Sequence, residues 1–266
     1  MRLAALLAAV AVTPVAFIGS HQNPDGGFSE AGRASDAALT AWAALGLAAA
    51  GAQAYGVTEY LAAHEDELAS TTDVALSLAA RTALGRPAPA LVARLERAQA
   101  ASGRIGPTVN STIWTVIAFR QAGHAVPRTT VRWLLARQAR SGGWSWSIGG
   151  RPDSNDTAAA IEALRATGVS GRPIARGLAF LRRLQNRDGG FELTPGRGSD
   201  AQSTAWAIQA FLAAGRPPGM AAFAYLGRLR RPDGSYRYSA RYAVTPVWVT
   251  SQVLPALARK PFPLRP

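Results

Sequence analysis

The stretch Arg176–Gly215, RGLAFLRRLQNRDGGFELTPGRGSDAQSTAWAIQAFLAAG, predicts two helices joined by a tight turn. Leucines recur at helical spacing up to Gln185, and the paired glycines of Asn186–Gly190 supply the positive φ angles that a tight turn needs. Asp200 then provides an N-cap for a second helix, and Gly215 ends that helix. One such hairpin cannot bury its own apolar face, so we expect the chain to repeat it.

Similar turns recur along the whole chain. The clearest copies are NPDGGF at Asn23–Phe28, SGGW at Ser141–Trp144 and RPDGSY at Arg231–Tyr236, and weaker turns stand at His64–Glu67 and Ala101–Ile105. The turns fall near residues 25, 66, 102, 141, 188 and 233, a spacing of about 36 to 47 residues that is typical of helical-hairpin arrays. A capped helix is expected after each turn, over residues 36–51, 73–85, 110–123, 153–168, 200–215 and 245–258. The sequence therefore predicts one domain of six helical hairpins.

The composition is that of a globular protein with room for one large core: 266 residues, 48% hydrophobic and 17% charged. Cysteine is absent, which removes disulfides, thiolate zinc sites and cysteine nucleophiles together. The net charge of +13 comes almost entirely from arginines scattered over outward helix faces. Because they do not alternate with aromatic residues in a run, we expect no nucleic-acid binding, and the charge favours peripheral contact with an anionic membrane surface instead. The oligomeric state is left open.

Residues 1–12 allow two interpretations. They form a short apolar stretch after Met1-Arg2, with Ala9-Val10-Ala11 as a small-residue cleavage site, which is typical of an export signal. They fit equally well as an apolar extension of the first helix, in which case a cytoplasmic location is not excluded. Thr13-Pro14 marks a helix start under both interpretations. We therefore place the repeats at residues 13–260 and a proline-rich tail, which cannot continue a helix, at 261–266.

The turns share a pattern of an aromatic, an aliphatic, a glutamine, a glycine and a second aromatic residue. Four repeats carry it in register: Phe180, Leu181, Gln185, Gly189 and Phe191; Trp133, Leu134, Gln138, Gly142 and Trp144; Phe17, Ile18, Gln22, Gly26 and Phe28; and Tyr225, Leu226, Gly234 and Tyr236, with Arg230 replacing the glutamine. This pattern resembles the glutamine–tryptophan repeat of squalene and hopene cyclases. The chain thus resembles a small, single-domain member of the terpene cyclase/protein prenyltransferase superfamily. The resemblance implies an all-α fold, an α/α toroid of six helical hairpins, with an apolar, isoprenoid-like small molecule in its central cavity.

The sequence DSNDTA, which begins at Asp153, is similar to the Asp-x-Asp-Asp-Thr-Ala motif of squalene cyclases, whose middle aspartate protonates an alkene. Asn155 occupies the position of that acid here, and an amide cannot deliver the proton. Asp153 or Asp156 could take over the catalytic role if burial or a neighbouring carboxylate raised the pKa of one of them, with Asn155 contacting the substrate. The other interpretation is that both aspartates cap the start of a helix, because Asp36 and Asp200 occupy the same position in other repeats.

Tryptophans recur on the second helix of several hairpins. If these helices form the inner ring, the indoles line or floor the cavity and contact an apolar ligand, and we assign four of them to substrate binding: Trp42, Trp114, Trp206 and Trp248. Ordinary packing between helices is the competing interpretation. The remaining three, Trp133, Trp144 and Trp146, are assigned to packing between repeats.

Metal and cofactor chemistry has no support in the sequence. Protein prenyltransferases bind zinc through Asp, Cys and His, and this chain has no cysteine. The acidic turn His64–Glu67 is expected to be solvated rather than to hold a cation. The leading hypothesis is therefore a cyclase-like toroid that binds an isoprenoid-like ligand and is a terpene cyclase or mutase if it is an enzyme. The alternative is a non-catalytic, exported binding or scaffold module; an open apolar cavity with Asp153 or Asp156 facing it favours the first, and a cavity plugged by side chains favours the second.

Overall fold

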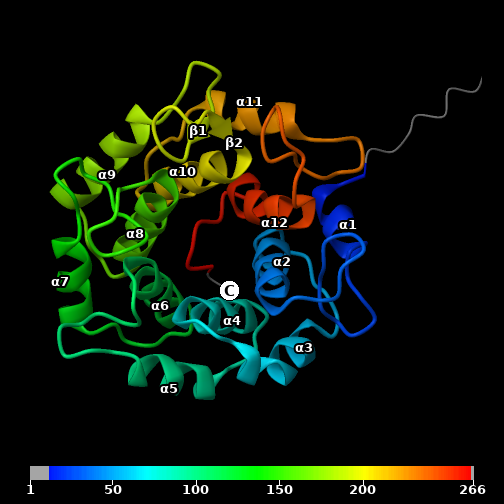
Figure 1. Cartoon of the computed structure of the whole chain (residues 1–266), viewed down its shortest axis with the longest axis horizontal. Helices are drawn as coiled ribbons and strands as arrows, with labels where there is room; N and C mark the ends of the chain where they lie inside the picture. The colour runs from blue at the N-terminus through cyan, green and yellow to red at the C-terminus, as the bar shows by residue number, and fades with distance from the viewer. Residues whose placement is uncertain (1–11, 265–266) are drawn as a thin grey trace, which may run out of the picture.

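The computed structural model describes residues 12–264, which form two concentric rings of helices (Figure 1). The outer ring consists of α1 (Pro14–Gly19), α3 (Val57–Ala63), α5 (Pro89–Arg97), α7 (Arg128–Ala136), α9 (Arg172–Arg183) and α11 (Met220–Leu229). The inner ring consists of α2 (Ala37–Ala49), α4 (Thr71–Ala83), α6 (Val109–Gln121), α8 (Ser154–Ala166), α10 (Ala201–Ala213) and α12 (Pro246–Leu257). Short connecting elements are the 3-10 turn η1 (Glu65–Glu67) and the antiparallel strands β1 (Phe191–Glu192) and β2 (Ser199–Asp200). The predicted all-α toroid of six hairpins is confirmed.

The inner helices form a closed ring. Each packs against the next, and α12 packs against α2 to complete the circle. Helix α2 is buried on almost every side, with Leu39, Trp42 and Leu45 and the alanines between them inside the protein. A helix that is apolar all round belongs to a core, whereas the outer helices bury one face. Helix α9, for example, buries Leu181 and leaves Arg182 exposed.

A threonine near the start of five inner helices fixes the turn that precedes the helix. Its Oγ1 accepts a hydrogen bond from a backbone N–H of the turn, in the pairs Phe28 and Thr40, Ile105 and Thr112, Trp144 and Thr157, Phe191 and Thr204, and Tyr236 and Thr250. Donor and acceptor are 2.8 to 3.0 Å apart in these bonds. The second hairpin has neither the glycines nor the threonine, and η1 forms its turn instead.

The turns also join the outer helices head to tail. Gln138 Nε2, in the turn after α7, donates a hydrogen bond to Pro173 O at 2.8 Å, at the start of α9. The last turn reaches the first helix in the same way, because Arg230 Nη2 donates to Val12 O at 3.0 Å. Arginine in place of the expected glutamine therefore preserves the contact that closes the outer ring.

Helix α1 starts where the sequence indicates. Thr13 Oγ1 accepts a hydrogen bond from the N–H of Ala16 at 3.1 Å, and Pro14 is the first helical residue. The two interpretations of residues 1–12 fall almost wholly outside the described residues. Within residues 12–264, every helix is too short or too polar to cross a membrane.

The residues after α12 turn into the centre of the toroid (Figure 1). Residues 259–264 are not helical, as the prolines of this segment require. Phe262 is only 2% exposed and lies among the side chains of the inner ring. This position could not be predicted from the sequence, because the segment carries no periodic pattern.

Candidate functional site

A cavity of about 450 Å³ opens where the amino-terminal ends of the inner helices converge. Each inner helix contributes to its wall, through Ala38, Thr72, Asn110, Asn155, Gln202 and Trp248 among others. Convergence of six helix starts on one cavity requires the inner helices to point the same way, as the repeat predicts. The volume lies within the range of about 300 to 1,000 Å³ that is usual for small-molecule sites.

The wall follows a simple register. In five inner helices, the second and sixth helical residues face the cavity, in the pairs Ala38 and Trp42, Thr72 and Leu76, Asn110 and Trp114, Asn155 and Ala159, and Gln202 and Trp206. Residues four apart lie above one another on a helix, so each pair gives one upper and one lower wall position. The upper position is polar in four of the five helices, and the lower position is apolar in all of them.

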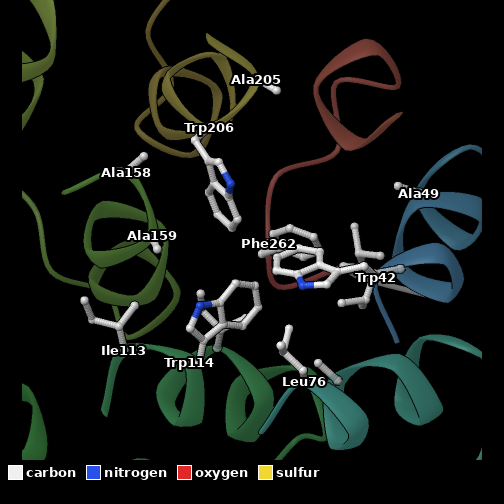
Figure 2. Close-up of a cluster of buried hydrophobic side chains, with 14 of the residues drawn as sticks. Trp42, Ala49, Leu76, Ile113, Trp114, Ala158, Ala159, Ala205, Trp206 and Phe262 are labelled. Carbon is white, nitrogen blue, oxygen red and sulfur yellow. The ribbon is translucent and has the colours of Figure 1, made fainter. Parts of the chain in front are cut away.

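Three indoles form the floor of this cavity. Trp42, Trp114 and Trp206 come from α2, α6 and α10 and point toward the axis of the toroid (Figure 2). The ring centroids are 5.1 Å apart for Trp42 and Trp114, and 5.6 Å apart for Trp114 and Trp206, with edge-to-face planes. Each of these side chains is 4 to 5% exposed. Trp248 lies against Trp42 at 5.8 Å, so the four tryptophans are at once the core of the ring and the apolar lining of the cavity.

Asp153 has the capping role that the sequence suggested for it. Its Oδ1 accepts the N–H of Asp156 at 2.9 Å at the start of α8. Asp36 and Asp200 accept the corresponding N–H groups of α2 and α10, both at 2.7 Å. Thr157 belongs to the set of threonines that fix the turns. These two positions of the DSNDTA sequence are therefore part of the common repeat.

Helix α4 carries Asp73 at its third helical position, half-buried and also at the cavity, whereas the carboxyl at that position of α8 is the buried Asp156. Asp156 is 6% exposed, and its Oδ1 accepts a hydrogen bond from Asn110 Nδ2 of α6 at 2.7 Å. Asn110 in turn accepts a bond from the hydroxyl of Thr72 on α4, at 3.1 Å. This chain of polar groups crosses three inner helices and holds the Asp156 carboxyl in the cavity wall.

Burial raises the pKa of both carboxyls at this wall. Burial, and then the charge of Asp153, raises the pKa of Asp156 well above its ordinary value, while the Asn110 amide lowers it. Burial also raises the pKa of Asp153, although hydrogen bonds from Asp156 and the helix start oppose the effect. Because Asp153 accepts hydrogen bonds from the N–H groups of the helix start, it is the better site for the negative charge. Burial therefore disfavours the charged form of Asp156 more strongly than that of Asp153.

Asn155 lines the cavity next to this pair. Its Oδ1 accepts a hydrogen bond from the hydroxyl of Ser154 at 3.1 Å. The sixth position below it is Ala159, where three other inner helices carry tryptophan. The small side chain leaves the cavity wider on the α8 side, beside the carboxyl pair.

Several cavity residues were not among the sequence candidates. Asn110 occupies the same second helical position as Asn155, so aligning the helix starts would have revealed it. Trp146 was assigned to packing between repeats, but it is 57% exposed and stands at the cavity. It lies outside the inner helices, in the connection before α8, where the helical register gives no information. Gln252 accepts hydrogen bonds from Trp206 Nε1 at 2.9 Å and Gln202 Nε2 at 2.8 Å, which fixes this side of the wall.

Across positions 12–264, no three His, Cys, Asp or Glu side chains lie close enough together to hold a metal ion. At the acidic turn His64–Glu67, Glu65 forms an ion pair with Arg81 of α4.

Comparisons with known proteins give the fold a wider context. No protein-family model and no curated protein matches the chain, but solved structures do. A protein from Actinoplanes is 18% identical, with a TM-score of 0.66 over 92% of this chain and 97% of its own. The type II terpene cyclase MstE from Scytonema, in its apo form, is 17% identical, with a TM-score of 0.66 over 92% and 95% of the two chains. A variant of MstE was solved with geranylgeranyl dihydroxybenzoate, its substrate.

A protein prenyltransferase shows the same likeness. Protein geranylgeranyltransferase-I from Candida albicans, complexed with GGPP, is 13% identical, with a TM-score of 0.63 over 83% of each chain. At this level of identity the comparison concerns the fold alone. The chain therefore has the helical toroid found in type II terpene cyclases and in a protein prenyltransferase.

Proposed function

We propose that the chain binds an apolar, isoprenoid-like molecule in the cavity, with the hydrocarbon against the indole floor and a polar end near Asn155 and Asp156. The observation that carries this proposal is one cavity with two contrasting ends. Its lower wall is aromatic and apolar, and its upper wall contains two neighbouring carboxyls, of which Asp156 has a pKa raised well above its ordinary value by burial. A prenyl chain with a polar end has the same division. The isoprenoid ligands of MstE and the Candida enzyme support this choice of ligand class.

The site also contains the groups that a proton-initiated cyclisation needs. We assign Asp156 as the acid: its proton would add to one carbon of an alkene, whose π electrons form the new C–H bond and leave a carbocation. Indole faces stabilise such a cation. Asp153 would retain its negative charge and hold the proton on Asp156 until transfer. Under this assignment the chain is a terpene cyclase or mutase of squalene-cyclase type, in which Asn155 replaces the usual acid.

A second candidate follows from the filled centre of the ring. Three indoles close the bottom of the cavity and Phe262 fills the space beneath them, and the position of the usual acid is an amide. A non-catalytic binding or scaffold module would have these features and would bind the same ligand without turning it over.

We further propose that the protein is exported and that it contacts an anionic membrane surface peripherally. Mass spectrometry of the natively produced amino terminus tests the export. An intact Met1 or Arg2 contradicts it.

Isothermal titration with farnesol tests the binding proposal. Wild-type protein is expected to bind this alcohol, and Ala159→Trp is expected to lose at least about tenfold in affinity, because tryptophan at the sixth position fills the open side of the cavity. Three other inner helices already carry tryptophan there, so the substitution suits the fold. Ala62→Trp, on the exposed face of α3, is the matched control and should bind like wild type. Absence of binding by the wild-type protein, or equal affinity of the Ala159→Trp variant, contradicts the proposal.

A further inference from the structure

Two backbone N–H groups of the segment 259–264 donate hydrogen bonds to side chains of the inner ring and hold the segment inside the toroid. The N–H of Phe262 donates to Glu162 Oε2 of α8 at 2.5 Å. The N–H of Leu264 donates to Gln121 Oε1 of α6 at 3.0 Å. Gln121 also donates from Nε2 to Ala79 O of α4, at 2.6 Å. Three inner helices therefore take part in positioning this segment.

Glu162 is an unusual residue for the place it occupies. It is 0% exposed, in the middle of an inner helix that is otherwise rich in alanine. A buried carboxyl costs free energy unless it is hydrogen-bonded. Among residues 12–264, the Phe262 N–H donates to Oε2 of Glu162, and Oε1 has no hydrogen-bond partner. Burial raises the pKa of Glu162 well above its ordinary value, and the hydrogen bond from the Phe262 N–H opposes this effect. Glu162 therefore anchors the segment 259–264 to helix α8.

The ring of Phe262 packs under the indole floor. Its centroid lies 5.8 Å from Trp114, 5.9 Å from Trp206 and 6.4 Å from Trp42 (Figure 2). Phe262 does not line the cavity; it contacts the three indoles that do. The floor therefore has two layers, in which the tail supports the indoles from the side opposite the cavity mouth.

We propose that Phe262 sets the depth of the cavity, and with it the length of apolar chain that the protein accepts. This inference rests on the proposed binding of an isoprenoid-like ligand. Phe262 acts as a positioning residue, because its effect passes through Trp42, Trp114 and Trp206. Removing the phenyl ring leaves an empty space below the indoles, and the indoles can move into it. The ring that is removed has about as many carbon atoms as one prenyl unit. A larger ring at this position would push them toward the mouth.

The experiment measures the affinity for farnesol and for the longer geranylgeraniol by titration calorimetry, in wild type and three variants. Phe262→Ala is expected to shift the affinity ratio of the two alcohols at least about tenfold toward geranylgeraniol. Phe262→Trp is expected to shift the ratio toward farnesol, and it retains a filled site if the alanine variant fails to fold. Phe211→Ala, which removes a buried phenyl ring of α10 that packs on Phe191 away from the cavity, should leave the ratio unchanged.

The outcomes separate the two proposals. Opposite shifts in the two Phe262 variants, with none in the Phe211 variant, support the role of the tail. An unchanged ratio in the folded Phe262 variants, while wild type still binds both alcohols, overturns the role of Phe262 and leaves the proposed function intact. If wild type binds neither alcohol, the proposed function fails and this inference fails with it.

Discussion

Asn110 Nδ2 donates a hydrogen bond to Asp156 Oδ1 at 2.7 Å, which joins α6 to α8 across the cavity wall. The two residues are far apart in the sequence and meet because their helices are neighbours in the inner ring. This bond favours the charged form of Asp156 and opposes the effect of burial. It therefore adjusts the acidity of the group to which we assign proton donation.

Replacing Asn110 tests that relationship. Asn110→Ala removes the donor, so the pKa of Asp156 is expected to rise further above its ordinary value. Carbon NMR of the labelled carboxyl groups measures it, with Asp156→Asn to assign the signal. Thr72→Val is the matched control, because it removes the neighbouring hydroxyl and keeps the bond between Asn110 and Asp156. An Asp156 titration that is the same in wild type and Asn110→Ala would show that the amide does not act on the carboxyl.

The carboxyl pair is expected to be essential to any turnover. If wild type converts a linear isoprenoid, the double variant Asp153→Asn and Asp156→Asn should lose about 100-fold or more of product formation, the usual range for removing a general acid. Chromatography with mass spectrometry quantifies the product, and circular dichroism confirms folding. Asp36→Asn changes a helix cap away from the cavity and should retain activity. Undiminished turnover in the double variant would remove both aspartates as proton donors.

Asp200 makes the stability depend on pH. Burial raises its pKa from 3.8 to about 6, so the folded state binds a proton that the unfolded state has lost. Stability is therefore expected to fall as the pH rises from about 4 to about 6, by about 3 kcal/mol from this group. Asp200→Asn should flatten this part of the profile, because asparagine also caps a helix.

Denaturant unfolding between pH 3.5 and pH 7 measures the effect. Asp200→Ala serves as the comparison, since it loses the cap as well and should be less stable than Asp200→Asn at every pH, by about 1 kcal/mol. The same pH slope in wild type and Asp200→Asn would contradict the assignment.

Arg230 joins the last turn to the start of the first outer helix through its hydrogen bond to Val12 O. Arg230→Ala removes the hydrogen bond to Val12 O and is expected to lower the free energy of unfolding by about 1 kcal/mol. Arg230→Gln introduces the residue that makes this kind of contact at Gln22 and Gln138, and it should retain most of the stability. Thermal unfolding compares the two variants. Equal melting temperatures for Arg230→Ala and wild type would mean that this contact does not hold the ring closed.

The fold could be predicted because its determinants are local and repeated. The glycine turn at Asn186–Gly190 and the cap at Asp200 each use neighbouring residues, and several copies reinforce the pattern. The site was only partly predictable. Asp153 and Asp156 were visible as a motif, but the sequence could not separate the common cap from the buried acid, because the contact with Asn110 depends on how the inner helices pair.

The positions of the segment 259–264 and of Trp146 could not be predicted from sequence patterns. Phe262 reaches the indole floor from a segment without periodicity, and its anchors Glu162 and Gln121 lie on helices that are distant in sequence. Trp146 faces the cavity from a connection, where side-chain direction follows loop geometry rather than helical register. Both placements arise from tertiary packing, which no single stretch of the chain encodes.

A crystal structure of the protein with farnesol tests the central claim most directly. The account predicts the hydrocarbon chain over Trp42, Trp114 and Trp206, with the hydroxyl within hydrogen-bond distance of Asn155 or Asp156. An empty cavity at saturating farnesol, or farnesol bound elsewhere on the protein, would contradict it.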